Sequence, residues 1–336
     1  MAISSWNAGI IRPVPVAPAG PFQDGAAPGV WTLDQATFWI QQGLWPIAGN
    51  TFQRGLFGKS DDITYISIQS TGNSIDFGNL QPSMPQNAGC ASSTRGLFGT
   101  DYDTPTSIAY VTIATLGNSV VFGNTLARIE RLAALSNETR GIWAGGSESI
   151  GRVNVIQYVT IASTGNTTDF GDLTTVLDNS TGCASTTRGI IGGGENAAAA
   201  TNVIQYVTIA STGNATDFGD LTLARYQPAS CSSNTRGVFA GGFGGGYSNI
   251  IDYVTIASAG NATDFGDLTV ARYGLAGCSS PTRGVFGGGT TGSNSNVMDY
   301  ITIATTGNAT DFGDLTLTAV DANNIVGACS NCHGGL

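Results

Sequence analysis

The stretch that decides the fold runs from Val285 to Phe312 and reads VFGGGTTGSNSNVMDYITIATTGNATDF. It opens with a short apolar run that enters a glycine-rich loop, where the backbone must pack closely or adopt positive φ. The YITIA phrase then alternates large apolar residues with threonine at a period of two, as a half-buried strand does. Gly307-Asn308 supplies turn chemistry before an aromatic phrase. Every element of the stretch is therefore predicted to be β-strand, turn or loop.

This unit is repeated six times along the chain. An arginine-glycine phrase opens each copy, at spacings of 41, 45, 48, 48 and 47 residues: Arg54, Arg95, Arg140, Arg188, Arg236 and Arg283. Each copy continues with a strand tyrosine: Tyr65, Tyr110, Tyr158, Tyr206, Tyr253 and Tyr300. A Gly-Asn turn then leads to an aromatic-glycine phrase at Phe77, Phe122, Phe170, Phe218, Phe265 and Phe312. Four short strands in such a unit are typical of one blade of a β-propeller.

The pattern resembles a known repeat family. A strand ending in Gly-Gly, a variable loop, a strand bearing tyrosine and an aromatic residue about a dozen positions later are similar to the kelch repeat, best seen in residues 285–312. Phenylalanine stands where kelch repeats usually carry tryptophan. The resemblance covers about 280 residues. It implies an all-β, six-bladed, kelch-like β-propeller.

Closure of the ring is also predicted by the repeat. An AGCSS-like phrase lies five residues before each arginine from the second copy onward, at Cys90, Leu135, Cys183, Cys231 and Cys278. A further version, VGACSN, surrounds Cys329 with no arginine-glycine strand after it, whereas Arg54 has only a weak version before it. We therefore predict that a C-terminal strand, from about Ile325 to Asn331, completes the first blade and leaves no free sheet edge.

The first fifty residues differ in composition, so the chain divides into an arm (1–50) and a propeller (51–336). The arm is rich in proline, which is typical of an extended segment. Thr32 and Gln35 predict a capping box that opens one short helix, ending near Gly43. Four of the five tryptophans lie in the arm: Trp6, Trp31, Trp39 and Trp45. They either pack on the protein's own surface or dock it onto a partner, since aromatic residues anchor partners efficiently.

Composition argues against several classes of function. The 336 residues include one lysine, one histidine (His333) and a formal net charge of −10. Nucleic-acid binding needs clustered Lys and Arg, and Ser–His or Cys–His catalysis would have only His333 available. No apolar run approaches the roughly 18 residues of a membrane helix, and the N-terminus does not resemble a secretory signal. We therefore expect a non-enzymatic protein without a cofactor, nucleic-acid partner or membrane insertion.

Half of the arginines and many of the carboxylates belong to the repeat. The DFGD phrase, which occurs four times, begins with Asp169, Asp217, Asp264 and Asp311. A repeated pair of carboxylates indicates a structural device, because an active site needs one asymmetric arrangement. We expect each repeated arginine to bind a carboxylate or strand-end carbonyl oxygens between blades, where its planar guanidinium suits partly buried partners. The alternative is a ring of solvated arginines.

The cysteines follow the repeat as well. Five of the six occupy one equivalent position, where the third blade has Leu135. Leucine can replace a packed thiol but not a disulfide or a metal ligand, so we expect buried free thiols. Cys329 to His333 matches the haem-attachment pattern CxxCH, but Cys329 is already explained as a blade residue. The loops offer oxygen ligands for Ca²⁺ but lack the spacing of known calcium loops, so no metal site is predicted.

Two phrases resemble virion structural proteins of tailed phages, particularly marine and cyanobacterial ones. They are APGVWTLDQATFWIQQGLWPIAGN, from Ala27 to Asn50, and the repeated TGNATDFGDLT with its neighbouring phrases. The resemblance implies a particle component made in the host cytoplasm, such as part of a tail or fibre. The arm would attach to other virion proteins, and homo-oligomerisation is compatible with such a role.

The propeller would then present its variable loops, which are residues 147–154, 195–202, 241–249 and 290–296. These loops differ in length and composition while the strands repeat, as binding surfaces on rigid scaffolds do. A host surface receptor or glycan is the expected ligand. A capsid decoration or purely architectural protein, and a carbohydrate-active propeller enzyme, are the alternatives.

Overall fold

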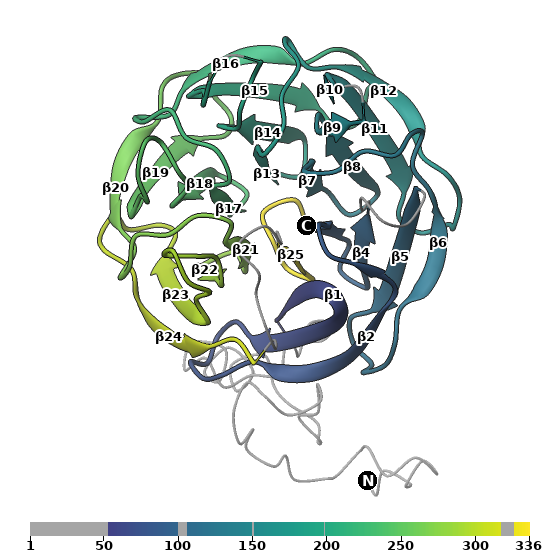
Figure 1. The fold of residues 1–336 in the computed structure, drawn as a ribbon, viewed down its shortest axis with the longest axis horizontal. Coiled ribbons are helices and arrows are strands. Elements are labelled where there is room, and N and C mark those ends of the chain that lie inside the picture. Colours follow the sequence, from purple (N-terminus) through teal and green to yellow (C-terminus); the bar gives the residue numbers. More distant parts are fainter. Residues whose placement is uncertain (1–52, 100–105, 150, 198, 317–325) are drawn as a thin grey trace, which may run out of the picture. The chain divides into compact units, whose positions relative to one another are not determined.

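A computed structural model describes residues 53–99, 106–149, 151–197, 199–316 and 326–336. Residues Arg54–Leu336 form one unit, whose strands make six blades around a central channel (Figure 1). The predicted six-bladed all-β propeller is confirmed. The predicted arm, its short helix and the four arm tryptophans (Trp6, Trp31, Trp39 and Trp45) lie outside the described residues. No helix in the described part of the chain is long and apolar enough to cross a membrane.

Five blades have four antiparallel strands each, which run in chain order from the channel to the rim. The second blade consists of β3 (Ala88–Ala91), β4 (Arg95–Gly99), β5 (Ser107–Thr112) and β6 (Val120–Asn124), and the third of β7 (Ala133–Ser136), β8 (Arg140–Ala144), β11 (Val155–Thr160) and β12 (Thr168–Asp172). The fourth consists of β13 (Thr181–Ala184), β14 (Arg188–Gly192), β15 (Val203–Thr208) and β16 (Thr216–Asp220). The fifth consists of β17 (Ala229–Ser232), β18 (Arg236–Ala240), β19 (Ile250–Thr255) and β20 (Thr263–Asp267). The sixth consists of β21 (Ala276–Ser279), β22 (Arg283–Gly287), β23 (Val297–Thr302) and β24 (Thr310–Asp314). A small hairpin, β9 (Ser147–Glu148) and β10 (Gly151–Arg152), lies in a loop of the third blade.

The first blade joins both ends of the propeller. It contains β1 (Arg54–Ser67), β2 (Ile75–Met84) and β25 (Gly327–Ser330). Residues 55–58 of β1 pair with β25, and residues between Ser60 and Tyr65 pair with β2, so β1 takes both middle places of the blade. Figure 1 shows the yellow β25 beside the purple start of the propeller. The predicted closure of the ring by the C-terminal strand is therefore confirmed.

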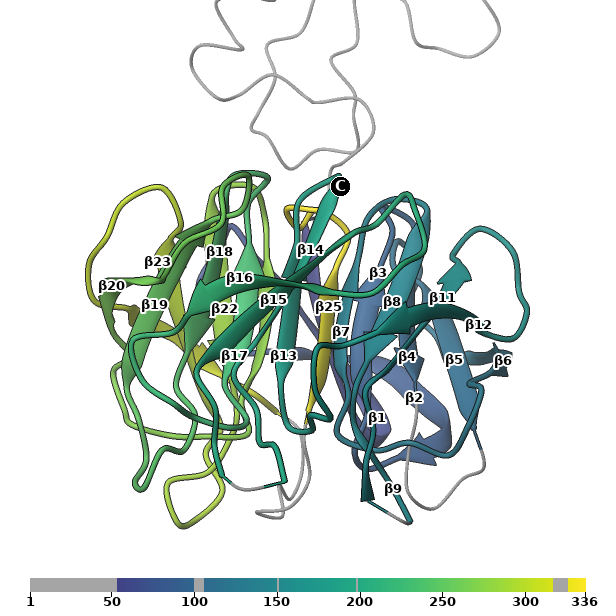
Figure 2. The ribbon, with the colours of Figure 1, turned by 90° about the horizontal axis from the view of Figure 1, so that it is seen from above.

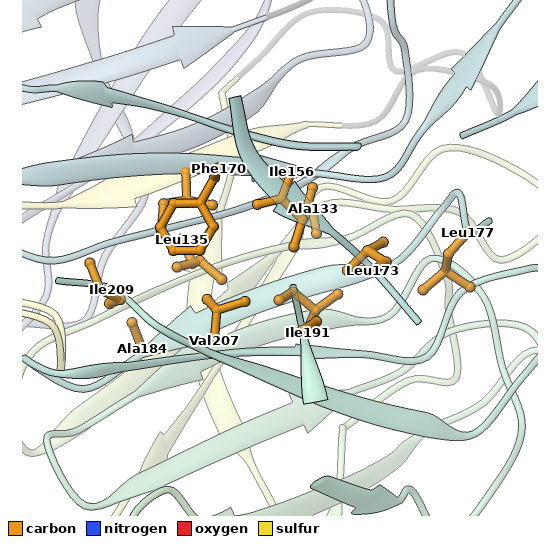
Figure 3. Packing of buried hydrophobic residues seen from close by; sticks show 13 residues of the cluster. Ala133, Leu135, Ile156, Phe170, Leu173, Leu177, Ala184, Ile191, Val207 and Ile209 are labelled. Atoms are coloured by element: carbon orange, nitrogen blue, oxygen red, sulfur yellow. The ribbon is translucent and has the colours of Figure 1, made fainter. Parts of the chain in front are cut away.

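The hydrophobic core lies between blades. Each of six buried clusters combines side chains of two neighbouring blades. Figure 3 shows one of them, in which Leu135 and Ile156 of the third blade lie near Ile191 and Val207 of the fourth. A blade thus buries its faces only against its neighbours, as in other repeat proteins.

The aromatic-glycine phrase forms a β-bulge in the outer strand pair. In the third blade Ile156 pairs with Gly171 and Gln157 pairs with Asp169, so Phe170 is the extra residue. Its buried ring meets Tyr158 edge-on, with 5.8 Å between centroids. The same T-shaped pair recurs in all six blades at 5.8–6.1 Å. The bulge thus directs one aromatic per blade into the core.

The Gly-Asn turns connect neighbouring blades at the rim, a role that their sequence does not indicate. Asn214 accepts a hydrogen bond at Oδ1 from the backbone N–H of Asp172 in the preceding blade, at 3.0 Å. The N–H of Gly213 donates to the carbonyl oxygen of Phe170 at 2.7 Å. Both bonds recur at all six blade interfaces. Gly171 must be glycine because its φ is +146° and a Cβ would lie 2.5 Å from the backbone of Gly213.

Candidate binding face

The six repeated arginines connect each blade to the next. Arg236 donates from Nη1 to the carbonyl oxygen of Ile303 at 3.0 Å, and its guanidinium lies 4.5 Å from the ring centre of Tyr253 in its own blade. All six make the equivalent hydrogen bond, at 2.7–3.1 Å. All six also lie over the tyrosine, at 4.3–4.8 Å. The structure therefore brings these arginines to strand-end carbonyl oxygens between blades.

Arg236→Ala is expected to lower the free energy of unfolding by about 2 kcal/mol. The loss combines a charge-assisted hydrogen bond with a cation–π contact, both partly exposed to solvent. Urea denaturation measures this loss of stability. The matched control is Asp217→Ala, which removes an exposed charge and should change stability by less than about 0.5 kcal/mol. Equal stabilities of the two variants would contradict the structural role of the arginine.

The repeated aspartates lie away from these arginines. The first carboxylate of each DFGD phrase is exposed on the outer strand of its blade: Asp169 on β12, Asp217 on β16, Asp264 on β20 and Asp311 on β24. The arginine contacts are made to carbonyl oxygens and tyrosine rings instead. These carboxylates therefore contribute to the acidic rim of four blades.

Each repeated cysteine packs against the glycine of the arginine-glycine phrase in the following blade. A Cβ at Gly237 would come within 3.0 Å of the sulfur of Cys183, and one at Gly189 would come within 2.5 Å of Leu135. All six cysteines are buried and free, as predicted. Burial raises the pKa of Cys183 to about 12, so its thiol stays protonated and is a poor nucleophile or metal ligand.

Cys329 of the CxxCH motif lies in β25, whereas Cys332 and His333 belong to the segment that follows it, residues 331–336, at one end of the strands (Figure 2). The thiol of Cys332 contacts the carbonyl oxygen of Ser279 at 3.6 Å, on one side of the channel. The imidazole Nε2 of His333 lies 3.1 Å from the carbonyl oxygen of Ala91, on another side. The motif's side chains thus hold the segment against the inner strands. Within the described ranges, no three or more His, Cys, Asp or Glu residues are grouped so as to hold a metal ion.

The hydrogen bonds of His333 define its protonation. The backbone N–H of Gly335 donates to Nδ1 at 3.1 Å, so Nδ1 carries no proton. The carbonyl oxygen of Ala91 can only accept, so Nε2 carries the proton. Burial of this neutral imidazole lowers the pKa of His333 to about 4, although its hydrogen bond to Ala91 opposes the shift.

The stability of the propeller should therefore depend on pH through His333. The imidazole of His333 is protonated near pH 6.5 in the unfolded chain and only near pH 4 in the folded chain. The stabilisation by the neutral imidazole is therefore complete above about pH 6.5 and is lost as the pH falls toward 4. The loss is at most about 3 kcal/mol, because the side chain keeps some solvent contact. Urea denaturation of the wild type and of His333→Gln between pH 7.5 and 4 measures it. A stability difference between the two that is constant over this range would contradict the buried neutral histidine.

The opposite end of the propeller is called the loop face here. It is formed by the loops between second and third strands (145–154, 193–202, 241–249 and 288–296) and by the links between blades (125–132, 173–180, 221–228 and 268–275). Figure 2 shows the C-terminus and β9 at opposite ends of the strands. The predicted variable loops therefore lie together on one face.

A row of four equivalent residues lines part of the channel where it opens on the loop face: Arg131, Asn179, Gln227 and Gly274. All four have left-handed backbone, with φ of 60°, 54°, 51° and 70° in that order. The N–H of each of the last three donates to the carbonyl oxygen of the residue before it in the row, at 2.7–3.1 Å. These three hydrogen bonds offset the roughly 1 kcal/mol that such a conformation costs a residue other than glycine.

Blades three and four carry a charged sector on the loop face: Glu130, Arg131, Arg152, Asp178 and Glu195. Arg152 forms ion pairs of 2.7 Å with both Asp178 and Glu195. Arg131 lies 3.6 Å from Glu130 and 3.9 Å from Asp178. Burial raises the pKa of Asp178, against the opposing effect of the Arg152 hydrogen bond. The sector thus ties the two blades together and leaves Arg152 and Glu195 partly exposed.

Blades five and six carry an aromatic sector on the same face: Tyr226, Phe243, Tyr247 and Tyr273. Tyr247 stacks on Tyr273 with 5.7 Å between centroids and 12° between planes. Phe243 contacts all three tyrosines at 5.4–5.7 Å. Tyr247 is 43% exposed. Burial, followed by the proximity of Tyr273, Glu195 and Tyr247, raises the pKa of Tyr226. The N–H of Gly194 donates to the carbonyl oxygen of Arg225 at 2.9 Å, so the two sectors adjoin at Glu195 and Tyr226.

The two sectors occupy equivalent places in the repeat. In four blades the link and the loop meet in a short antiparallel bridge, formed by Glu130 with Ser147, Asp178 with Glu195, Tyr226 with Phe243, and Tyr273 with Thr290. The backbone contact is the same in these four blades while the side chains change from charged to aromatic. Ser147, Glu195, Phe243 and Thr290 lie in the variable loops that the sequence predicts to contact a ligand, whereas the link residues were not singled out: Glu130, Asp178, Tyr226 and Tyr273. The signal was available, because they are the points at which the otherwise regular copies depart from one another.

Comparison with known proteins does not place the chain in a family. A scan against protein-family models found no match, and a search of curated proteins found no significantly similar sequence. The fold and the composition of the loop face are therefore the basis for a functional proposal, together with the sequence resemblances described above.

Proposed function

We propose that this protein is a non-enzymatic structural component of a tailed-phage virion, whose N-terminal arm attaches to the particle and whose loop face contacts the host surface. The observation that carries the binding role is the change of side chains at equivalent positions of the loop face. A ring of six similar blades needs no such change for its own stability.

The repeated polar groups support a scaffold rather than an enzyme. The repeated arginines and Gly-Asn turns make the same contacts at all six blade interfaces, and the repeated cysteines do so at five, with Leu135 in the place of cysteine at the sixth. What remains for function is the part of each copy that varies. A rigid scaffold that presents varied loops is the usual construction of a binding surface.

The assignment to a virion rests on the sequence. The segment from Ala27 to Asn50 and the TGNATDFGDLT repeat resemble virion proteins of tailed phages. The arm's tryptophans are suited to docking on a partner protein. A tail or fibre position follows from the proposed contact with the host.

The test uses intact particles. Electron microscopy of the virion, with the protein labelled at its C-terminus, should place it on the tail or its fibres. Particles that carry the arm without residues 54–336 should assemble but adsorb poorly to host cells. Unchanged adsorption would overturn the host-contact role, and a position on the capsid shell would favour a decoration protein.

A further inference from the structure

The aromatic sector is a rigid platform with one ring open to solvent. Tyr247 is fixed by stacking on Tyr273 and by its edge contact with Phe243. Its hydroxyl reaches the sixth blade, where a Cβ on Gly292 would lie 3.3 Å from the oxygen. Contacts from two blades therefore hold a ring that is still 43% exposed.

The platform is not required by the fold. The third and fourth blades make the same bridge between link and loop with charged and polar residues. They have the same four-stranded sheets and the same interblade hydrogen bonds without a cluster of aromatic rings at this place. Four aromatic side chains gathered beside the channel opening, with Tyr247 43% exposed, therefore indicate a ligand.

The surroundings of the platform are polar but mostly uncharged. Residues 244–246 are exposed glycines, and residues 291–294 are Thr, Gly, Ser and Asn. On the side of the fourth blade the platform adjoins Glu195, whose side chain is 32% exposed in its ion pair with Arg152. The site thus combines one flat aromatic face with hydroxyls, backbone amides and a single charged pair.

This combination matches the chemistry of a sugar. A pyranose presents C–H groups on its face, which pack on the electron-rich face of an aromatic ring, and hydroxyls at its edge, which need hydrogen-bonding partners. The centre of a protein–protein interface would instead be a close-packed apolar patch, and the non-aromatic residues here are small and polar.

We propose that the aromatic sector binds an oligosaccharide, with one sugar ring stacked on Tyr247 and neighbouring units extending toward Glu195 and Arg152. This proposal rests on the host-contact function proposed above and specifies its ligand. The chain's acidic rim disfavours polyanionic glycans, so the ligand is a neutral or amino-sugar glycan.

The first experiment applies the full chain to a printed array of several hundred glycans and compares variants on those that bind. Wild type should bind at least one neutral or amino-sugar glycan. Tyr247→Ala should lose at least tenfold in affinity, whereas Tyr247→Phe keeps the ring and should stay within about threefold. Leu116→Ala removes a side chain that is 55% exposed on the second blade, and should bind as wild type does.

Binding to no such glycan, or an affinity of Tyr247→Ala within twofold of wild type, would overturn the proposal.

A second experiment separates the sugar proposal from the proposed function. The full chain is applied to host cells before and after periodate oxidation, which cleaves the vicinal diols of surface sugars. Loss of adsorption after periodate and in Tyr247→Ala supports both proposals. Adsorption that survives periodate, or that Tyr247→Ala retains, keeps the host-contact role and overturns the sugar. A chain that does not adsorb to untreated cells overturns the host-contact role.

Discussion

Arg225→Leu is expected to lower the free energy of unfolding by about 3–5 kcal/mol, because it leaves a buried carboxylate without its partner. Arg225 and Asp252 are both fully buried, and Nη2 of the arginine lies 2.9 Å from Oδ2 of the aspartate. The same nitrogen donates to the carbonyl oxygen of Phe239 at 3.2 Å. Burial lowers the pKa of Arg225, an effect that Asp252 opposes. The carboxylate of Asp252 therefore supplies the counter-charge for the guanidinium in the interior.

The third and fourth blades show how the same place is filled without charges. Two positions of the repeat vary together. One is the residue just before the strand tyrosine, and the other lies in the link, six residues before the inner-strand Cys or Leu. The pairs are Gln157 with Ile129, Gln205 with Leu177, Asp252 with Arg225, and Asp299 with Arg272. Gln205 accepts hydrogen bonds from the N–H and the hydroxyl of Thr174, both at 2.8 Å. Thr222 makes the same two bonds to Asp252.

The double variant Arg225→Leu/Asp252→Gln should therefore recover most of the loss and lie within about 1 kcal/mol of wild type. It gives the fifth blade the pair that the fourth blade already uses. Urea denaturation of the wild type, both single variants and the double variant completes the cycle. Additive effects of the two substitutions would contradict a coupled buried pair. Arg272→Leu, with its own partner Asp299 at 2.9 Å, should behave as Arg225→Leu does.

The fold could be predicted from the sequence because each local signal occurs six times. One copy of YVTIAS is a short apolar run that a buried helix segment could also explain, but six copies at blade spacing leave only a propeller. The unpaired VGACSN phrase at Cys329 likewise predicted ring closure, since no arginine-glycine strand follows it and Arg54 has only a weak version of the phrase before it.

Contacts between blades were harder to predict from the sequence than the strands themselves. Asn214 reads locally as a turn residue, and its bond to Asp172 joins positions 42 residues apart whose relation only the ring defines. The repeated arginines could be assigned to blade interfaces, but their choice of carbonyl over carboxylate depends on which strand ends meet. Phe170 was recognised as an aromatic, whereas the bulge that turns it inward follows from register.

The candidate site was predicted only in part: Phe243 and Tyr247 lie in the predicted variable loop 241–249, whereas Tyr226 and Tyr273 were missed. Searching for repeats directs attention to what the copies share, and the aromatic sector is what they do not share. Tyr226 and Asp178 are equivalent positions with unrelated side chains, so neither is part of a motif. Only the fold shows that Tyr226, Tyr247 and Tyr273, from two blades, lie together.

Deletion of residues 326–336 is expected to abolish the cooperative folding of the ring. The deletion removes β25, whose residues 327–330 pair with residues 55–58 of β1, and it exposes the core that Val326 and Cys329 cover. Lost burial and strand pairing together amount to at least about 5 kcal/mol, which is comparable to the whole stability of a typical domain. Urea denaturation followed by circular dichroism measures the change, and a transition like that of the full chain would contradict ring closure by β25.

Two further measurements separate the strand from the segment that follows it. Deletion of residues 332–336 keeps β25 and removes only the contacts of Cys332, His333 and the final glycines with the inner strands. It should cost about 2–3 kcal/mol and leave a cooperative transition. A synthetic peptide of residues 326–336, added to the chain that lacks them, should restore part of the native signal because β1 still presents its unpaired edge. The same peptide with Cys329→Asp should not, since a carboxylate would then be buried in the core between the first and second blades.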